Sequence, residues 1–312
     1  MPEENNPRVI PAIVGPTASG KSELGIRLAL AIGGEIVNLD SVQVYRRLYV
    51  ATAKVPQPER RGVPHHLIDL VEPTENLTAG QYARLAGDAI RDIESRGRYA
   101  VLVGGTGFYL RALARPLFEG PQTDLKLRAR LASLRERHGA EHLHRMLQRL
   151  DREAATAISP RDWSRSMRGI EFFFQTGGRI SQARDLTPEA SEFAARIRVI
   201  ALNPPRDELY RRINERADRM FESGLVEEVE SLLALRIPPN AKAFQAHGYK
   251  RVVEYLMGKR TREDALNQMK LDTRHYAKRQ LSWWRAWPDV KWIARFGNDP
   301  EALTEALRFL KD

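Results

Sequence analysis

The sequence predicts an α/β fold in which helices flank a parallel sheet and a small helical domain is inserted. Short apolar runs alternate with amphipathic stretches over residues 9–114, a rhythm typical of parallel strands joined by crossover helices. From Thr123 the chain becomes helical, polar and strongly basic, and strand-like apolar residues return at 197–202. We therefore expect a core made of residues 1–121 and 196–312, interrupted by a basic helical domain at 122–195.

Each expected element follows from its own pattern. Strands are short apolar runs bounded by turn residues, expected at 9–14, 35–39, 99–103, 197–202 and 290–293. Helices show apolar residues three or four apart, and some carry end signals, such as Thr78 with Gln81 at a start and Gly33 at an end. The expected helices span 21–32, 78–96, 108–114, 123–137, 140–150, 162–175, 206–223, 225–235, 248–257, 262–284 and 300–310.

Composition and charge limit the class of protein. The 312 residues are 42% hydrophobic, which is too apolar for general disorder. Fifty Lys and Arg against 40 Asp and Glu give a net charge of +10, which suits a polyanionic partner. The absence of cysteine excludes disulfides, thiolate metal sites and cysteine nucleophiles. No apolar run resembles a membrane span or a signal peptide, so we expect a cytoplasmic protein that does not associate with a membrane. We also expect it to be a monomer.

A phosphate-binding loop is the strongest motif. The run Gly15-Pro16-Thr17-Ala18-Ser19-Gly20-Lys21-Ser22 matches G-x-x-x-x-G-K-[ST] and stands between an expected strand and an expected helix. Its glycines let backbone N–H groups point inward, Lys21 supplies a full charge, and Ser22 is a candidate ligand for Mg²⁺. The motif indicates a ligand that carries a diphosphate, without specifying ATP.

Two further polar residues follow expected strands. Asp40 ends the second strand, and the C-terminal ends of parallel strands share one rim, so Asp40 and Lys21 should face the same crevice. A carboxylate there is a candidate general base, although Asp40 could instead cap the next turn. The strand at 99–103 runs into Gly104-Gly105-Thr106 without the carboxylate that nucleotide hydrolases place there. Thr106 is a candidate donor to a leaving diphosphate, or simply a turn residue.

Basic helices are the other signal. Between Thr123 and Arg152, eight Lys and Arg stand against four acids. Arg165 and Arg168 are three apart on one helix face, and Arg274 and Lys278 recur on a late helix with aromatic residues. Such faces contact nucleic-acid phosphates, or are merely solvated. The pair His65-His66 favours a structural role over a metal site, because neighbouring strand residues point to opposite faces.

The chain resembles the tRNA dimethylallyltransferase family, also called tRNA isopentenyltransferase. The resemblance covers roughly residues 10 to 290. Its carriers are GPTASGKS at 15–22, DSVQVY at 40–45, TAK at 52–54, PHHLID at 64–69, VGGTG at 103–107, SRSMR at 164–168, GY at 248–249 and TRHYAKRQ at 273–280. DSVQVY and TRHYAKRQ are far more specific than the phosphate loop, which many kinases share.

The resemblance implies transfer of a dimethylallyl group from dimethylallyl diphosphate to N6 of adenosine 37, beside the tRNA anticodon. It implies that the phosphate loop, with Mg²⁺, holds the diphosphate of the prenyl donor. Asp40 would be the general base, and Lys21, Thr106 and Arg216 would assist catalysis. The tRNA contacts it implies, together with two basic residues of the late helix, are Asp40, Ser41, Val42, Gln43, Thr106, Arg128, Ser164, Arg165, Ser166, Met167, Arg168, Arg274 and Lys278.

Two departures from the family pattern stand out. Ala51 occupies a position that is usually glycine, and would be strained if that turn needs a positive φ. His247 precedes Gly248-Tyr249 where an aliphatic residue is common. Two other functions stay open: a P-loop kinase of a nucleoside, nucleotide or small metabolite that uses ATP, and a non-catalytic RNA-binding protein.

Overall fold

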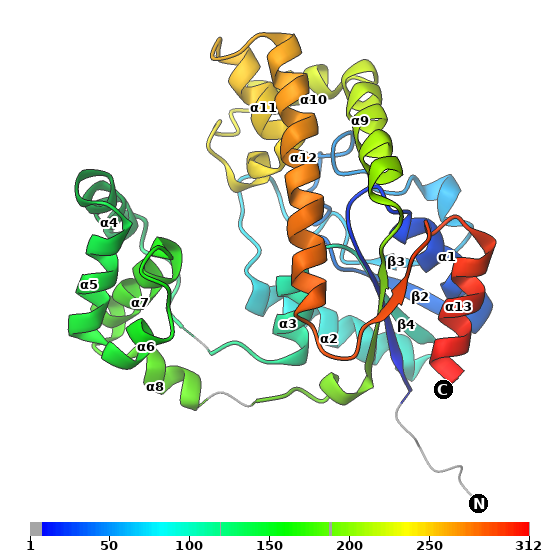
Figure 1. The fold of residues 1–312 in the computed structure, drawn as a ribbon, viewed down its shortest axis with the longest axis horizontal. Helices are drawn as coiled ribbons and strands as arrows, with labels where there is room; N and C mark the ends of the chain where they lie inside the picture. Colours follow the sequence, from blue (N-terminus) through cyan, green and yellow to red (C-terminus); the bar gives the residue numbers. More distant parts are fainter. Residues whose placement is uncertain (1–7, 119, 187–188, 312) are drawn as a thin grey trace, which may run out of the picture. The chain divides into compact units, whose positions relative to one another are not determined.

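The computed structural model describes residues 8–118, 120–186 and 189–311 (Figure 1). The chain divides into two compact units, one made of Met1–Ala114 with Glu192–Asp312 and the other of Arg115–Ser191. The expected insertion, 122–195, overlaps most of the second unit, whose two ends lie a few residues earlier in the chain. Within the described residues, no helix combines the length and apolar composition that crossing a membrane would need.

The first unit is built on a six-stranded sheet in the order β3-β2-β4-β1-β5-β6. Every strand pairing is parallel, which confirms the predicted fold class. The strands are β1 (Ile10–Val14), β2 (Gly34–Asn38), β3 (His65–His66), β4 (Tyr99–Val103), β5 (Ile197–Leu202) and β6 (Lys291–Ile293). The central strands are almost completely buried, as parallel strands covered on both faces must be.

Helices cover both faces of this sheet. Helix α1 (Lys21–Ile32) links β1 to β2, and α2 (Ala79–Ser95) links β3 to β4 in the opposite direction along the sheet, so right-handed crossovers place the two helices on opposite faces. Helix α13 (Pro300–Lys311) contacts α1 and shares its hydrophobic core, whereas α3 (Gly107–Ala114) packs against α2. Thr78 and Gln81 form the expected capping box, and α1 ends at Gly33 with φ 67°.

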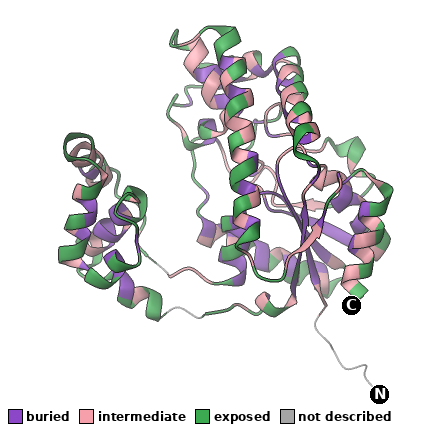
Figure 2. Cartoon of the chain, in the orientation of Figure 1, coloured by how far each residue is buried: buried purple, intermediate pink, exposed green. Residues whose placement is uncertain are grey.

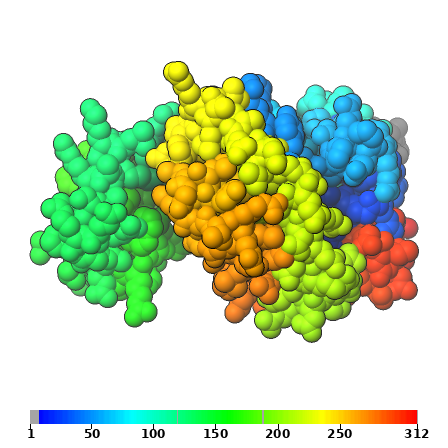
Figure 3. Space-filling model, turned by 90° about the horizontal axis from the view of Figure 1, so that it is seen from above, coloured from blue at the N-terminus to red at the C-terminus, as the bar shows by residue number. Residues whose placement is uncertain are grey.

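Four further helices complete the first unit. They are α9 (Arg206–Glu222), α10 (Leu225–Ala234), α11 (His247–Leu256) and α12 (Arg262–Arg285), and short 3₁₀ turns lie at Gln57–Arg60, Ala194–Arg196 and Lys242–Gln245. Helix α12 contacts both α9 and α11, and Figure 3 shows these helices side by side on one face of the unit. Tyr249 of α11 is fully buried and donates to Glu228 of α10 at 2.5 Å, and Trp284 near the end of α12 is fully buried as well.

The second unit has its own hydrophobic core, drawn in purple in Figure 2. It consists of α4 (Leu125–His138), α5 (Ala140–Leu150), α6 (Arg152–Thr156), α7 (Trp163–Thr176) and α8 (Ile180–Asp185). The fully buried carboxylate of Glu171 accepts two hydrogen bonds from Arg128, at 2.5 and 2.6 Å, and lies 3.8 Å from Arg168. Opposite charges inside the unit therefore tie α4 to α7.

Some short elements escape prediction from the sequence. Helices α6 and α8 have five and six residues, too few for a helical period to show. Strand β3 has only two residues and pairs at the edge of the sheet with Ile36 and Val37. The other expected strands and helices are confirmed to within a few residues at their ends.

Replacement of Glu171 by Ala should destabilise the second unit by roughly 1–3 kcal/mol, because Arg128 and Arg168 lose a buried charged acceptor. The measurement is thermal unfolding of the full chain followed by circular dichroism. Glu136→Ala on α4 is the matched control, since the Glu136 side chain is 71% exposed and its ion-pair distance is 3.9 Å. Equal stability of the two variants would contradict a structural role for the Glu171 cluster.

Candidate functional site

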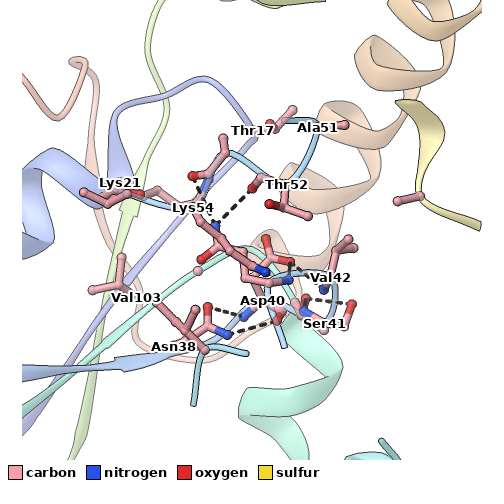
Figure 4. Close-up of a pocket in the computed structure, with 18 of the residues that line it drawn as sticks. Thr17, Lys21, Asn38, Asp40, Ser41, Val42, Ala51, Thr52, Lys54 and Val103 are labelled. Atoms are coloured by element: carbon pink, nitrogen blue, oxygen red, sulfur yellow. Dashed lines mark hydrogen bonds between the residues drawn. The ribbon is translucent and has the colours of Figure 1, made fainter. Parts of the chain in front are cut away.

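A cavity of about 1030 Å³ opens in the first unit where β1, β2 and β4 end. Its lining comes from the phosphate loop, the segments 40–45 and 51–56, the start of α3, and helices α9, α11 and α12. Figure 4 shows Thr17 and Lys21 of the loop around the same space as Asp40, Thr52 and Lys54. Every lining residue belongs to the first unit.

The phosphate loop has the predicted strand–loop–helix setting. Gly20 at the start of α1 has φ 86° and Ala18 has φ 63°. A Cβ on Gly15 would lie 2.8 Å from the carbonyl oxygen of Leu202, so glycine is needed where the loop crosses β5. Nζ of Lys21 donates to the carbonyl of Pro16 at 2.6 Å. The loop is thus a curled backbone with a lysine folded over it, as anion binding requires.

Asp40 lies at the end of β2 and faces the cavity. Its Oδ1 accepts hydrogen bonds from the N–H of Val42, at 2.8 Å, and of Gln43, at 3.4 Å. Asp40 therefore caps the turn, as one of the two sequence interpretations expected, and its role as a general base stays a prediction. No residue that the structure describes donates to its Oδ2, which leaves that oxygen available for chemistry in the cavity.

Thr106 follows β4 on the same rim. Its Oγ1 accepts from the N–H of Ser41 at 3.0 Å and lies 3.3 Å from Oγ of Ser41, and its own N–H donates to Leu39. Tyr276 of α12 lines the same cavity as Thr106. Thr106 is therefore fixed beside the turn that carries Asp40.

Among the cationic side chains that line the cavity with Asp40, three have a pKa that burial lowers. Burial lowers the pKa of Lys21 to about 8, although Asp40 opposes that shift and Arg216 adds to it. Burial also lowers the pKa of Arg216, against the effect of Asp40. Lys54 is 5% exposed and pairs with Asp69 at 2.6 Å, and burial lowers its pKa too. This concentration of desolvated positive charge favours a multiply charged anion.

The segment around Ala51 and Lys54 is fixed by a carboxylate that does not line the cavity. Glu228 of α10 accepts from the N–H groups of Tyr49, at 3.0 Å, and Val50, at 3.1 Å. The positive φ in this turn belongs to Ala53, at 50°, and not to Ala51, so the strain considered for Ala51 is absent. A Cβ on Gly248 would lie 2.8 Å from Cβ of Ala51, and the two small residues therefore fit each other.

His247, the second departure, also lines the cavity at the start of α11. Its ring packs edge-on against Tyr276 with centroids 5.4 Å apart, and burial lowers its pKa. His65, which also lines the cavity, has Nδ1 2.8 Å from the carbonyl of Val63, and Nε2 of His66 lies 2.7 Å from the carboxylate of Glu35. Nothing in the described part of the chain groups three or more His, Cys, Asp or Glu for a metal.

The residues expected to contact nucleic acid divide between exposed and internal positions. In the second unit, Ser164 and Arg165 are exposed. The side chains of Ser166 and Met167 are buried, and Arg128 and Arg168 are engaged with Glu171. In the first unit, Val42 and Gln43 line the cavity with Asp40 and Ser41. On α12, Lys278 is exposed, whereas the guanidinium of Arg274 lies 5.9 Å from the ring centroid of Tyr210. The contacts themselves stay a prediction.

The sequence analysis predicted no role for two residues of the site, Lys54 and Gln280. Both belong to motifs that carry the family resemblance. Oε1 of Gln280 accepts from the N–H of Thr17 at 2.9 Å, and its Nε2 donates to Gly105 at 3.0 Å. Gln280 lies four residues after Tyr276, so the two side chains share one face of α12. This spacing is the sequence feature that could have linked Gln280 to the site.

Comparison with known proteins confirms the family resemblance. The family model described as IPP transferase matches residues 43–287. The chain is 45% identical to a tRNA dimethylallyltransferase from Solibacter usitatus, over 95% of this chain and 96% of the relative. A tRNA isopentenylpyrophosphate transferase structure from Bacillus halodurans matches with TM-score 0.70 and 36% identity, covering 97% of this chain and 95% of that one. A eukaryotic dimethylallyltransferase acting on tRNA matches with TM-score 0.74 and 30% identity, covering 88% and 69%.

The lowered pKa of Lys21 predicts how the affinity for inorganic diphosphate depends on pH. Lys21 is charged below about pH 8 and neutral above it. An anion binds the charged form, so affinity should fall as pH rises through 8, approaching about tenfold per pH unit. Calorimetric titration of wild type against Lys21→Arg checks this, because arginine keeps its charge over the whole range. A constant ratio of the two affinities from about pH 7 to 9.5 would contradict the assignment.

Proposed function

Because this chain belongs to the IPP transferase family, we propose that it transfers a dimethylallyl group from dimethylallyl diphosphate to N6 of adenosine 37 in tRNA. The observation that carries the proposal is the cavity that brings Lys21 and Arg216 together with Asp40 and Thr106. The cations suit a diphosphate, while the free Asp40 oxygen suits a proton from an amine. We further propose that the enzyme works as a monomer in the cytoplasm.

The reaction exchanges one bond for another at C1 of the prenyl group. The lone pair of N6 forms the new C1–N bond, and the C1–O bond breaks with its electrons leaving on the diphosphate. Because the amine lone pair is delocalised into the ring, N6 is a poor nucleophile, and Asp40 removes its proton as the bond forms. Lys21, Arg216, the loop N–H groups and Thr106 stabilise the departing charge.

Magnesium fits this site as an ion brought with the donor. Ser22 lines the cavity directly after Lys21 and offers one hydroxyl oxygen. Mg²⁺ commonly takes its remaining ligands from substrate phosphates and water, so a full set of protein carboxylates is not needed. Ser22 would hold the ion with the diphosphate, and the ion would add positive charge against the leaving group.

The tRNA must bring its base to the cavity in an extruded state. A base that is stacked in the anticodon loop cannot reach a pocket closed by protein, so the nucleotide has to be flipped out. Asp40–Gln43 and Thr106 would meet the base, and the exposed basic residues of the second unit would contact phosphates of the anticodon stem.

The function is tested by incubating the protein with unmodified tRNA, Mg²⁺ and either dimethylallyl diphosphate or ATP. A dimethylallyl group on adenosine 37 and release of diphosphate are expected with the first donor alone. Phosphoryl transfer from ATP would instead support a P-loop kinase. RNA binding without any product would support the non-catalytic alternative.

Asp40→Asn should lower kcat by roughly 10²–10⁴, the usual contribution of a general base. Asparagine keeps an oxygen for the N–H groups of Val42 and Gln43, so the turn is preserved while the proton acceptor is lost. Steady-state kinetics give kcat, and titration with inorganic diphosphate gives donor-site affinity, which should change little. Asp88→Asn, an exposed carboxylate on α2, is the control. Turnover near the wild-type value in Asp40→Asn would return Asp40 to a capping role alone.

Arg165→Ala should weaken tRNA binding and reduce its salt dependence, because the Arg165 side chain is 62% exposed on α7. Each lost phosphate contact lowers the slope of log affinity against log salt by about 0.7–0.9. Binding is measured at several salt concentrations, with Arg308→Ala on α13 as the control. Arg168→Ala also disturbs the Glu171 cluster, so the single Arg165 variant is cleaner. An unchanged slope and affinity would make Arg165 a solvated surface residue.

A further inference from the structure

We propose that Gln280 is a positioning residue, which holds the diphosphate-binding loop and the Thr106 turn at the separation that the reaction requires. The proposal rests on the function proposed above. Gln280 is 5% exposed on α12, and its side-chain amide has a partner at each end. Its Oε1 accepts from the N–H of Thr17 at 2.9 Å, and its Nε2 donates to the carbonyl of Gly105 at 3.0 Å.

These two partners come from different parts of the machinery. Thr17 belongs to the loop that follows β1, whereas Gly105 belongs to the turn that follows β4 and immediately precedes Thr106. Thr106 in turn accepts from the N–H of Ser41, the neighbour of Asp40. Hydrogen bonds at Gln280 and Thr106, joined by the Gly105–Thr106 peptide, therefore connect the diphosphate loop to the turn of the general base.

The close approach at Gly105 shows that the amide is tightly placed. A Cβ on Gly105 would lie 2.0 Å from Nε2 of Gln280, and a Cβ on Gly107 would lie 2.0 Å from Nε1 of Trp283. Tyr276, Gln280 and Trp283 follow one another at helical spacing, so one face of α12 lies against this turn. The glycines let the turn approach α12 closely enough for the bridge to form.

Only a neutral amide of this length satisfies both partners. Glutamate keeps the acceptor for Thr17 but sets a negative oxygen against the carbonyl of Gly105. Methionine keeps the volume and loses both hydrogen bonds. A catalytic group displaced by about 1 Å can cost about 10² in rate, so losing the bridge should act on kcat more than on binding.

The test compares Gln280→Met and Gln280→Glu with wild type in steady-state kinetics, at a temperature where circular dichroism shows each variant folded. We expect kcat to fall about 10²-fold in Gln280→Met with the KM for tRNA changed less than threefold. Gln268→Met is the matched control, because Gln268 lies on the same helix and loses one hydrogen bond, to Asp272, outside the cavity. Its kcat should stay at the wild-type value.

A double-mutant cycle with Thr106→Val separates positioning from general support of the fold. If Gln280 acts through Thr106, the second substitution should lower kcat far less in the Gln280→Met background than in wild type. Independent multiplication of the two losses, or an unchanged kcat in folded Gln280→Met and Gln280→Glu, would overturn the proposal.

Inorganic diphosphate binding keeps this test distinct from that of the proposed function. If wild type transfers no prenyl group, the proposed function is wrong. The hydrogen bond between Gln280 and Thr17 is still tested in that case, because it is measured through the affinity for diphosphate. That affinity should fall several-fold in Gln280→Met and stay at the wild-type value in Gln268→Met. Equal affinity in Gln280→Met and wild type would overturn the bridge to the loop.

Discussion

The parallel direction of β1, β4 and β2 is the constraint on which the site depends. Because these strands are neighbours in that order, their C-terminal ends deliver three loops to one rim. Adjacent strands lie about 4.8 Å apart, so the phosphate loop and Asp40 start roughly 10 Å apart with the Thr106 turn between them. That distance leaves room, between the cation and the base, for a diphosphate and the C1–O bond that breaks. If one of these strands ran antiparallel to the others, the loop that follows it would lie at the opposite end of the sheet.

The electrostatics of the cavity follow from the same crowding. Lys21, Arg216 and Lys54 are cations withdrawn from water, and each has a pKa lowered by burial. Lys54 has a carboxylate partner in Asp69, whereas Lys21 bonds only a backbone carbonyl in the described structure. Holding such charges unneutralised is unfavourable, so the free energy of the site improves when an anion enters. The cavity is therefore prepared for the leaving group before substrate arrives.

The sequence predicts this part of the site because the evidence is local. A phosphate loop, an aspartate and a threonine directly after buried strands are recognised from neighbouring residues, and parallel topology then brings them together. Gln280 is different, because its partners Thr17 and Gly105 lie 263 and 175 residues away. Glu228 likewise anchors a loop 178 residues earlier. No spacing rule links such positions, since packing of α10 and α12 against the loops creates the contacts.

The inserted unit shows why a count of basic residues overstates the charge available for RNA. Arg128 and Arg168 share one buried carboxylate, so part of their charge serves the link between α4 and α7. A buried glutamate in a polar helix cannot be told from a solvated one by periodicity, and Glu171 therefore escaped prediction. The exposed Lys and Arg positions in the described part of the unit are Arg115, Lys126, Arg130, Arg137, Arg145, Arg149, Arg152, Arg161, Arg165, Arg179 and Arg184. The number of phosphates that the unit can neutralise, and hence its salt dependence, is set by these positions rather than by its total charge.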